Sequence, residues 1–371
     1  MPYDAIVIGG GLAGCSASLQ LAERGHAVLL LEKSAYPSHK LCGEFLSPES
    51  QSSFQRLGVL DAVRAAGAHP ITEARFTAPN GTEAGSSLPG TALGLSRYRL
   101  DEMLFEQAQA AGVDGRTRSR VTDVRGSLED GFVVSAGDQT FEGRLVLGAY
   151  GKRGTLDRTL DRDCLHSSSL VAFKAHFAGA DVPNTIELHG FEGGYCGCSH
   201  VEAGRMNVCW IGTTEALQAA GGSPEAMMEQ AQAQNPALAD RLAGTTRVSD
   251  RFEAVSQVSL QRKGCFAGGV CMIGDTAQMI APLCGDGMAM ALSAADLVVD
   301  PADAFLRRQA SAEAFRKRYI RRWEETFSTR LRVGRGAHRA AFHPRSASLL
   351  VQTFRLLPPI ARWAIRTTRG M

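Results

Sequence analysis

Three glycines near the N-terminus have the spacing of a phosphate-binding loop. Gly9, Gly11 and Gly14 directly follow the β-branched run at residues 5–8. In a G-x-G-x-x-G loop the first glycine makes the tight turn, the second lets backbone approach a pyrophosphate, and the third lets helix and sheet pack closely. The N-terminus of the helix that follows would then face the phosphates. The spacing therefore predicts a dinucleotide-binding site.

The residues around these glycines predict a complete β-α-β unit. Residues 5–8 form an apolar strand, residues 15–24 carry apolar side chains at helical spacing, and residues 27–31 form a second buried strand. Gly25 can end the helix between them. Glu32 closes the second strand, where a carboxylate accepts hydrogen bonds from an adenosine ribose. This unit does not by itself distinguish NAD from FAD.

A second strand, loop and helix of related composition lies far downstream. Residues 269–273 indicate a buried strand, and Asp275 follows it. Residues 282–287 form a glycine-containing loop, and an apolar helix is predicted over residues 288–299. We call residues 274–287, which include Gly274, Asp275 and these loop glycines, the second glycine loop, and we expect it to bind the same ligand as the first.

Together these segments resemble the FAD-dependent oxidoreductases with the p-hydroxybenzoate-hydroxylase type of fold. That group includes group A flavin monooxygenases, geranylgeranyl reductases and flavin halogenases. The resemblance spans roughly residues 1–300 and implies FAD at the N-terminal site, with Asp275 on the ribityl chain and the loop of Gly285 and Gly287 against the isoalloxazine. The cofactor contacts that it implies are Gly9, Gly11, Ala13, Gly14, Glu32, Lys33, Lys40, Cys42, Gly43, Arg97, Val121, Gly274, Asp275, Gly285, Gly287 and Met288.

The helix that begins near Met288 has a physical reason to lie beside a flavin. Reduced flavin carries negative charge near N1 and the C2 carbonyl. The unpaired N–H groups at the start of a helix favour a nearby anion. Such a helix would make the flavin easier to reduce.

Two further segments match family patterns. Residues 95–112 resemble the R-x-x-L/F-D-x-x-L helix, whose Arg counterpart, Arg97, lies against the cofactor. By composition alone this is an ordinary amphipathic helix. Residues 37–44 resemble the P-x-x-K-x-C-G segment of the geranylgeranyl reductase branch, in which Cys and Gly approach the flavin. A buried free Cys usually acts as a small hydrophobe, so a chemical role for Cys42 rests on the resemblance.

The substrate-facing motifs of the family are changed in this chain. Halogenases usually carry W-x-W-x-I-P, which is absent here, so halogenation is not expected. The Y-x-W-x-F-P motif of geranylgeranyl reductases matches only at Tyr195, and Gly197, Cys198 and Ser199 stand in place of bulkier residues. These small side chains predict a roomier cavity, suited to a large or ring-containing substrate. In the family's Asp-Gly segment, Tyr150 replaces the Asp where monooxygenases contact both flavin and nicotinamide nucleotide.

We therefore expect an FAD-dependent monooxygenase, a hydroxylase or epoxidase, acting through a flavin C4a-hydroperoxide. Its substrate would be an apolar small molecule, aromatic or polyketide-like, and NAD(P)H would be the transient reductant. The alternatives are a flavin alkene reductase like the geranylgeranyl reductases and, because of Tyr150, a flavin-binding module without turnover. The candidate catalytic side chains are Tyr195 and His200 for proton transfer, and Cys42.

The predicted fold class is α/β, with a Rossmann-like FAD-binding domain, an inserted and mostly antiparallel substrate-binding sheet, and a C-terminal helical segment. The FAD-binding domain would comprise residues 1–70, 94–163 and 264–300. The substrate-binding domain would comprise residues 71–93 and 164–263, and the basic helical segment residues 301–371.

Several elements of these domains are predicted individually. We expect a hairpin over residues 71–88 with its turn at Asn80-Gly81. One helix is expected over residues 223–242. Further strands are expected over residues 120–124, 165–177, 185–195, 205–213 and 255–260. Cys196 and Cys198 would project from one strand toward a cavity, and two such Cys cannot complete a zinc site, so no metal is expected.

Composition narrows the remaining function classes. The chain has 371 residues, 44% of them hydrophobic, and a net charge of +2, which gives no reason to expect nucleic-acid binding. Nine Cys without a regular framework suit a reducing, cytoplasmic setting with free thiols. No leader peptide or spanning helix is predicted. The oligomeric state, monomer or dimer, stays open.

Charge is concentrated at the C-terminus. From residue 300 onward, sixteen Arg and Lys stand against five Asp and Glu, and no acid follows Glu325. Residues 348–366 mix Leu, Phe, Trp and Ile with Arg. This segment could dock on the acidic remainder of the protein, which we favour, or lie on an anionic membrane surface as a peripheral contact.

Overall fold

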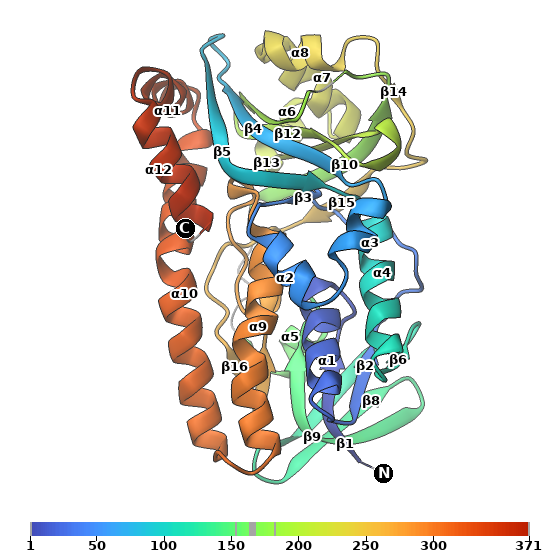
Figure 1. Cartoon of the computed structure of the whole chain (residues 1–371). Helices are drawn as coiled ribbons and strands as arrows, with labels where there is room; N and C mark the ends of the chain where they lie inside the picture. Colours follow the sequence, from blue (N-terminus) through green and yellow to red (C-terminus); the bar gives the residue numbers. More distant parts are fainter. Residues whose placement is uncertain (1, 153, 163–167, 182, 370–371) are drawn as a thin grey trace.

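The computed structural model describes residues 2–369 except residues 153, 163–167 and 182. Two sheets lie one above the other in the view of Figure 1, and long helices run along the side of the lower one. The α/β class and the C-terminal helical segment predicted from the sequence are confirmed. The domain ranges stay a prediction.

The lower sheet has a parallel centre, as the β-α-β unit requires. Its strands are β1 (Tyr3–Ile8), β2 (Val28–Leu31), β6 (Asp114–Arg116), β7 (Val121–Ser127), β8 (Gly131–Ala136), β9 (Gln139–Gly148), β16 (Phe266–Ala267) and β17 (Val270–Met272). The order is β16-β17-β9-β1-β2-β6, with β17, β9, β1, β2 and β6 parallel and β7-β8-β9 an antiparallel meander. The apolar runs of β1 and β2 are buried because helices cover the sheet.

The upper sheet is mostly antiparallel. Its strands are β3 (Phe45–Leu46), β4 (His69–Thr77), β5 (Glu83–Gly94), β10 (Leu170–Ala178), β11 (Thr185–Phe191), β12 (Gly194–His200), β13 (Met206–Thr213), β14 (Thr246–Arg247) and β15 (Glu253–Ser256). The order is β14-β10-β13-β12-β11-β4-β5-β3, with β15 also on β10 and one parallel pair, β11 and β4. Segments on either side of the helix at residues 97–110 therefore meet in one sheet.

Nine of the twelve α-helices in the described residues fall into three groups. The bounds of all twelve are α1 (Leu12–Glu23), α2 (Ser50–Arg56), α3 (Leu60–Ala65), α4 (Arg97–Ala110), α5 (Leu156–Thr159), α6 (Thr214–Ala219), α7 (Pro224–Gln234), α8 (Pro236–Leu242), α9 (Gly287–Leu306), α10 (Ala312–Ala341), α11 (Pro344–Leu356) and α12 (Pro358–Arg369). Helices α1, α4, α9 and α10 accompany the lower sheet, α6–α8 cover the upper one, and α11 and α12 lie beside β5. Short 3₁₀ turns occur at Glu202–Gly204, Gly274–Thr276 and Pro282–Cys284.

The C-terminal segment docks on the rest of the protein through one helix face. Phe315, Tyr319, Trp323 and Phe327 recur every four residues along α10 and are buried against the core. The Tyr319 hydroxyl also donates a hydrogen bond to the Met272 carbonyl of β17, at 3.0 Å. The docked arrangement favoured from the sequence is thus present along α10.

Three sequence expectations need correction. Residues 185–195 contain a strand, a tight turn and the start of the next strand, because Gly193 takes a positive φ of 77°. Residues 223–242 form two helices, since Asn235 leaves helical geometry before Pro236 and caps the second helix with its side chain. The strand expected over residues 255–260 ends at Ser256. The hairpin turn at Asn80-Gly81 is confirmed.

Candidate functional site

A polar cavity lies where β1 and β2 end and α1 begins. Its volume is about 990 Å³. We call it the polar cavity because charged side chains recur along its wall. Among its lining residues are Gly9, Gly11, Glu32, Lys33, Lys40, Arg97, Val121, Tyr150, Lys152, Lys174, His176 and Asp275.

The three glycines of the first loop occupy positions where a side chain would collide or obstruct. Gly9 has a φ of 110°, and a Cβ there would lie 2.5 Å from the Ala149 carbonyl oxygen. A Cβ on Gly14 would lie 1.8 Å from the Gly9 carbonyl oxygen, so this glycine permits the close contact between helix and strand. A Cβ on Gly11 would meet only the Arg97 guanidinium, at 3.5 Å, and would otherwise point into the cavity.

Glu32 holds the first loop through backbone hydrogen bonds. Its carboxylate accepts from the Gly10 N–H at 2.8 Å and from the Ser34 N–H at 2.9 Å, and it is buried. Glu32 also lines the polar cavity, as does Val121. The ribose contact of Glu32 stays a prediction, and the structure adds a role in fixing the loop.

Arg97 is fixed by a buried carboxylate one helical turn away. Its Nε and Nη2 atoms donate to the two Asp101 oxygens at 2.6 Å and 2.8 Å, and Lys40 Nζ lies 2.7 Å from the same group. Burial alone would raise the pKa of Asp101, but Arg97 and Lys40 lower it below its ordinary value. Asp101 therefore orients both predicted cations at the cavity wall.

The loop of Cys42 and Gly43 rests on a buried ionic cluster that the sequence analysis missed. Glu44 is fully buried and contacts Lys174 Nζ, and its other oxygen lies 2.6 Å from His176 Nε2. Burial would raise the pKa of Glu44, but Lys174 and His176 lower it. Glu44 also accepts the Arg97 N–H at 2.8 Å. The signal was present in β10, where Lys174 and His176 interrupt an otherwise apolar strand.

The second glycine loop joins the polar cavity to an apolar one. Asp275 lines both cavities, whereas Gly285, Gly287 and Met288 line the apolar one. Burial raises the pKa of Asp275, against the opposing effect of Lys152, Arg97 and Lys263. Gly274 is not among the lining residues of either cavity.

Gly274 lets the second loop approach the first. It has a φ of 59°, and a Cβ there would lie 3.1 Å from the Ala13 Cβ at the start of α1. Ala13 itself lines the apolar cavity. The convergence of the two glycine loops, residues far apart in sequence, is thus a feature of the fold.

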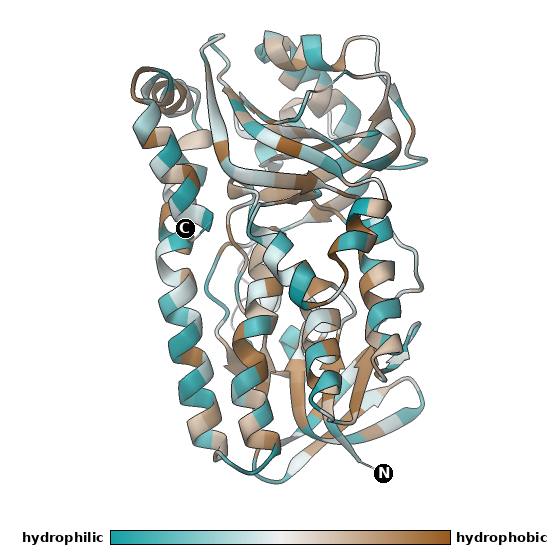
Figure 2. Cartoon of the chain, in the orientation of Figure 1, coloured by the Kyte–Doolittle hydropathy of each residue, from teal (hydrophilic) through white to brown (hydrophobic). Residues whose placement is uncertain are grey.

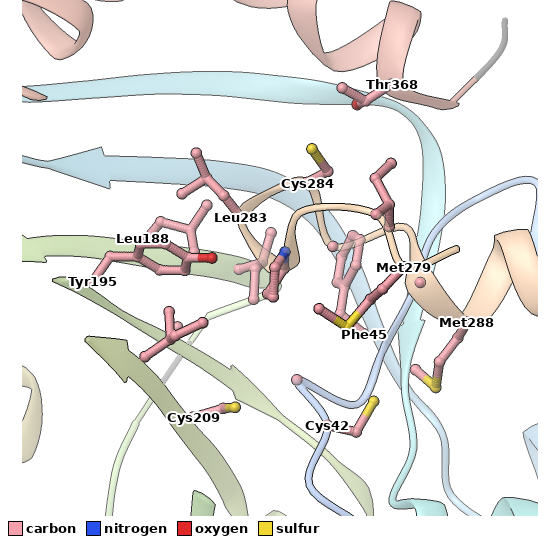
Figure 3. Close-up of a pocket in the computed structure, with 18 of the residues that line it drawn as sticks. Cys42, Phe45, Leu188, Tyr195, Cys209, Met279, Leu283, Cys284, Met288 and Thr368 are labelled. Atoms are coloured by element: carbon pink, nitrogen blue, oxygen red, sulfur yellow. The ribbon is translucent and has the colours of Figure 1, made fainter. Parts of the chain in front are cut away.

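The apolar cavity has a volume of about 330 Å³. Figure 3 shows Cys42 and Cys209 on one side of it, Tyr195 and Leu188 on another, and Thr368 on a third. Other lining residues come from the upper sheet, from the loop before α9 and from the last three helices: Phe45, Phe76, Gly197, Met279, Leu283, Cys284, Ala341, Val351, Phe354 and Ile365. Its walls are therefore assembled from segments across the whole chain.

The start of α9 carries a buried acid, one residue after Gly285 of the apolar cavity wall. Asp286 is the N-cap residue of α9 and is fully buried. Burial raises its pKa to about 7, although Arg369 and Arg330 act against this. Arg369 Nε, on the last helix, lies 3.8 Å from an Asp286 oxygen. A neutral Asp286 leaves the positive end of the helix dipole unopposed.

The three predicted catalytic side chains are not brought together. Cys42 and Tyr195 line the apolar cavity, and the Tyr195 hydroxyl lies 3.5 Å from His338 Nδ1. Burial raises the pKa of Tyr195 well above its ordinary value. His200 is not among the lining residues of either cavity, because it ends β12 with its ring 5.0 Å from that of His69.

The prediction that Cys196 and Cys198 project from β12 toward a cavity is wrong. Cys196 and Cys198 do not face a cavity; they are fully buried in the core between the upper sheet and α7 and α8. Of Gly197, Cys198 and Ser199, only Gly197 lines the apolar cavity. Alternation along β12 sends neighbouring side chains to opposite faces of the sheet. The eight cysteines that the structure describes are free thiols.

Tyr150 is held by hydrogen bonds to a buried ion pair, Asp157 and Arg162. Its hydroxyl donates to an Asp157 oxygen at 2.9 Å and accepts from Arg162 Nη1 at 3.1 Å. Arg162 is buried and also donates to the Thr276 carbonyl at 2.9 Å, beside Asp275. Tyr150 thus connects its loop to the second glycine loop.

Comparison with known proteins identifies the family. The model of the FAD binding domain matches residues 2–319. The chain belongs to this FAD-binding family. It is similar to digeranylgeranylglycerophospholipid reductase 2 of Methanopyrus kandleri, with 26% identity over 341 residues that cover 88% of this chain and 83% of the relative.

Two further proteins show how widely this fold is used. The 3-hydroxybenzoate 6-hydroxylase of Klebsiella oxytoca is 25% identical over half of this chain and 49% of the relative. The flavin-dependent brominase Bmp2 superposes with a TM-score of 0.85 at 18% identity, covering 100% of this chain and 94% of that one. The protein is thus an FAD-dependent oxidoreductase of the p-hydroxybenzoate-hydroxylase-like superfamily, in which NAD(P)H is the typical reductant.

The residues of both cavities fit FAD. The polar cavity offers the open space above Gly11 and the N-terminus of α1 to a pyrophosphate. Asp275 lies where the polar and apolar cavities meet, and Gly285 lines the apolar one. FAD supplies hydride and oxygen chemistry when bound. The individual contacts predicted from the sequence stay predictions.

Proposed function

We propose that this oxidoreductase is a monooxygenase, a hydroxylase or epoxidase, that acts on a large apolar metabolite. The apolar cavity beside the flavin loops carries the proposal. Its charged lining residues are Glu44, Arg97, Lys152, Asp275 and Arg369, and the rest of its wall consists largely of aliphatic, aromatic and thiol side chains. Such a wall can bury an apolar substrate and exclude water from the reacting atoms.

The proposed reaction balances with reagents of the family. One atom of oxygen enters a C–H or C=C bond of the substrate. The other atom leaves as water, with two electrons from NAD(P)H and a proton from solvent. The chain's own residues would bind the apolar substrate and hold it against the flavin, which is a positioning role. Gly197 leaves room for a ring because no side chain projects from this position of β12.

Tyr195 is the side chain that we assign to proton handling. Its hydroxyl faces the apolar cavity near His338. Burial lowers the pKa of His338 to about 4, so the imidazole is neutral at neutral pH. Because burial also keeps the Tyr195 hydroxyl protonated, the pair can hold a proton at the cavity wall without carrying charge.

A flavin alkene reductase is the second candidate. The digeranylgeranylglycerophospholipid reductases among the relatives align over most of their length, whereas the 3-hydroxybenzoate 6-hydroxylase aligns over about half. The Lys40-Leu41-Cys42-Gly43 segment also resembles the reductase branch, and Cys42 lines the apolar cavity. In a reductase, the Tyr195 hydroxyl would be the proton donor that completes hydride addition.

Product analysis of the holoenzyme distinguishes the candidates. The FAD protein is reduced anaerobically with NADH, NADPH or dithionite, and is then mixed with a long-chain alkylphenol or with geranylgeraniol as probe. A probe that gains one oxygen atom from isotopically labelled O₂ supports the monooxygenase. A probe that gains two hydrogen atoms without O₂ supports the reductase and overturns the first proposal.

Reoxidation kinetics provide a second readout. A monooxygenase is expected to pass through a transient species with its own absorbance spectrum when the reduced protein meets oxygen. Slow, simple reoxidation without such a species, together with no labelled product, contradicts the monooxygenase. Failure of every donor to reduce the bound flavin would leave a flavin-binding module without turnover and overturn both enzyme proposals.

A further inference from the structure

Exposed large apolar side chains are concentrated in one short stretch near the C-terminus. Seven large hydrophobic side chains are exposed among the residues that the structure describes, and five of them belong to α11, α12 and the turn between these helices. We call these five the hairpin patch: Leu349 (65% exposed), Leu356 (68%), Leu357 (51%), Ile360 (39%) and Trp363 (59%).

All exposed charged side chains of the two helices that carry the hairpin patch are arginines. The exposed arginines of the same two helices are Arg345, Arg355, Arg362 and Arg366. No Asp or Glu follows Glu325 in the sequence. Hydrophilic and hydrophobic stretches therefore alternate along α12, as Figure 2 shows. Exposed apolar side chains that share their helices with arginines are typical of helices that lie in the interface of an anionic bilayer.

The opposite face of the hairpin explains why both helices are held firmly. Val351 and Phe354 of α11, and Ala361 and Ile365 of α12, are buried toward β5 and the apolar cavity. The cavity wall includes Val351, Phe354, Ile365 and Thr368. The exposed side chains are thus not needed for packing within this chain.

We propose that the hairpin patch docks the protein on an anionic lipid bilayer. Leu356, Leu357 and Trp363 would enter the headgroup and acyl boundary, and the arginines would contact lipid phosphates. Because the docked face and the cavity wall belong to the same two helices, docking places the apolar cavity next to the bilayer. Docking itself does not depend on the proposed reaction and can be tested without turnover.

Sedimentation of the FAD protein with vesicles tests whether the hairpin patch binds an anionic bilayer. We expect pelleting with vesicles of phosphatidylcholine and phosphatidylglycerol, weaker pelleting with phosphatidylcholine alone, and release at high salt, because salt screens the arginines. Replacing Arg355, Arg362 and Arg366 together by Gln should weaken partitioning roughly a hundredfold, since each basic residue near the surface contributes about a fivefold step and three steps multiply.

The apolar contribution is tested with matched charge insertions. Leu356→Glu and Trp363→Glu should each weaken partitioning about tenfold or more, because a carboxylate enters the interface and apolar burial is lost. Val133→Glu is the control, since Val133 is 42% exposed on the distant β8 and lines neither cavity. Bound FAD and the circular dichroism spectrum report whether each variant is folded.

Tryptophan fluorescence reports whether the hairpin patch is the part of the protein that faces the acyl chains. Trp210 and Trp323 are buried (1% and 3% exposed), so vesicles with brominated acyl chains should quench mainly Trp363. Trp363→Phe should remove that quenching. Equal binding by wild type and Leu356→Glu, or no binding to anionic vesicles, would overturn the proposal. A dimer in solution that Leu356→Glu dissociates would assign the patch to a second copy and overturn it as well.

Discussion

The polar and apolar cavities of this protein meet at Gly11, Arg97 and Asp275 but are built in opposite ways. The polar cavity depends on backbone shape at a few glycines of one short loop, where a side chain would collide with backbone or block the open space. The apolar cavity depends on side chains from the upper sheet, from the loops at the flavin end of the lower sheet and from helices near the C-terminus. A position that needs an unusual backbone angle or a close contact admits few residue types besides glycine, so it leaves a signature in the sequence. A position in an apolar wall accepts many side chains and leaves none.

The largest expected effect comes from a glycine whose missing side chain lets helix and strand pack closely. Gly14→Ala should abolish FAD binding, because the new Cβ would lie 1.8 Å from the Gly9 carbonyl oxygen and would push α1 away from β1. Flavin absorbance per mole of purified protein measures this. Gly336→Ala in α10 is the matched control, since its Cβ meets no atom within 4 Å. A fully yellow Gly14→Ala protein would show that close packing is not required there.

A second effect concerns the charged support of the polar cavity. Glu44→Gln should lower the free energy of unfolding by about 3–5 kcal/mol, because the charge of Lys174 then stays buried without its partner. Urea unfolding monitored by circular dichroism measures this loss. Glu313→Gln breaks an exposed pair with Lys317 and should leave the midpoint unchanged. Equal midpoints for Glu44→Gln and wild type would contradict the role assigned to the buried cluster.

A third effect concerns the apolar cavity alone. Gly197→Phe should fill part of this cavity and weaken binding of the alkylphenol probe about tenfold or more, since the added ring competes with the ligand for space. FAD content should be retained. Cys198→Ala is the control, because its side chain points into the opposite core. The probe can be followed by equilibrium dialysis. Unchanged probe binding in Gly197→Phe would place the probe elsewhere.

The smallest effect concerns the buried acid at the start of α9. Burial raises the pKa of folded Asp286 to about 7 from an ordinary value of 3.8, so the folded state binds a proton that the unfolded state has lost. Its contribution to stability is therefore present below about pH 4 and falls as pH rises toward 7. The urea midpoint of Asp286→Asn should fall less than that of wild type over this range. Parallel pH profiles would indicate that Arg369 and Arg330 cancel the effect of burial.

The sequence predicted the positions whose conformations are restricted. Gly9 and Gly25 take positive φ angles at the turns where a glycine was expected. The apolar runs of β1 and β2 pair in parallel, as a β-α-β unit requires. Hydrophobic periodicity also located α4 and α9. These features could be predicted because each leaves a local signature in residue type and spacing.

Side-chain direction in the upper sheet could not be predicted in the same way. Cys196 and Cys198 were assigned to a cavity, but β12 turns that face toward α7 and α8. His200 was assigned to catalysis, but the strand end carries it to His69. A strand has two faces, and its partners decide which face meets the cavity.

The sequence by itself determined that two glycine loops, an acid after each strand and a basic C-terminal segment are present, since these follow from local spacing and charge. Only the tertiary structure decided that Gly274 brings the second loop against Ala13, that Glu44 pairs with Lys174, and that α11 and α12 wall the apolar cavity. Such contacts join residues far apart in the chain, and their partners depend on how the two sheets and the C-terminal helices pack together.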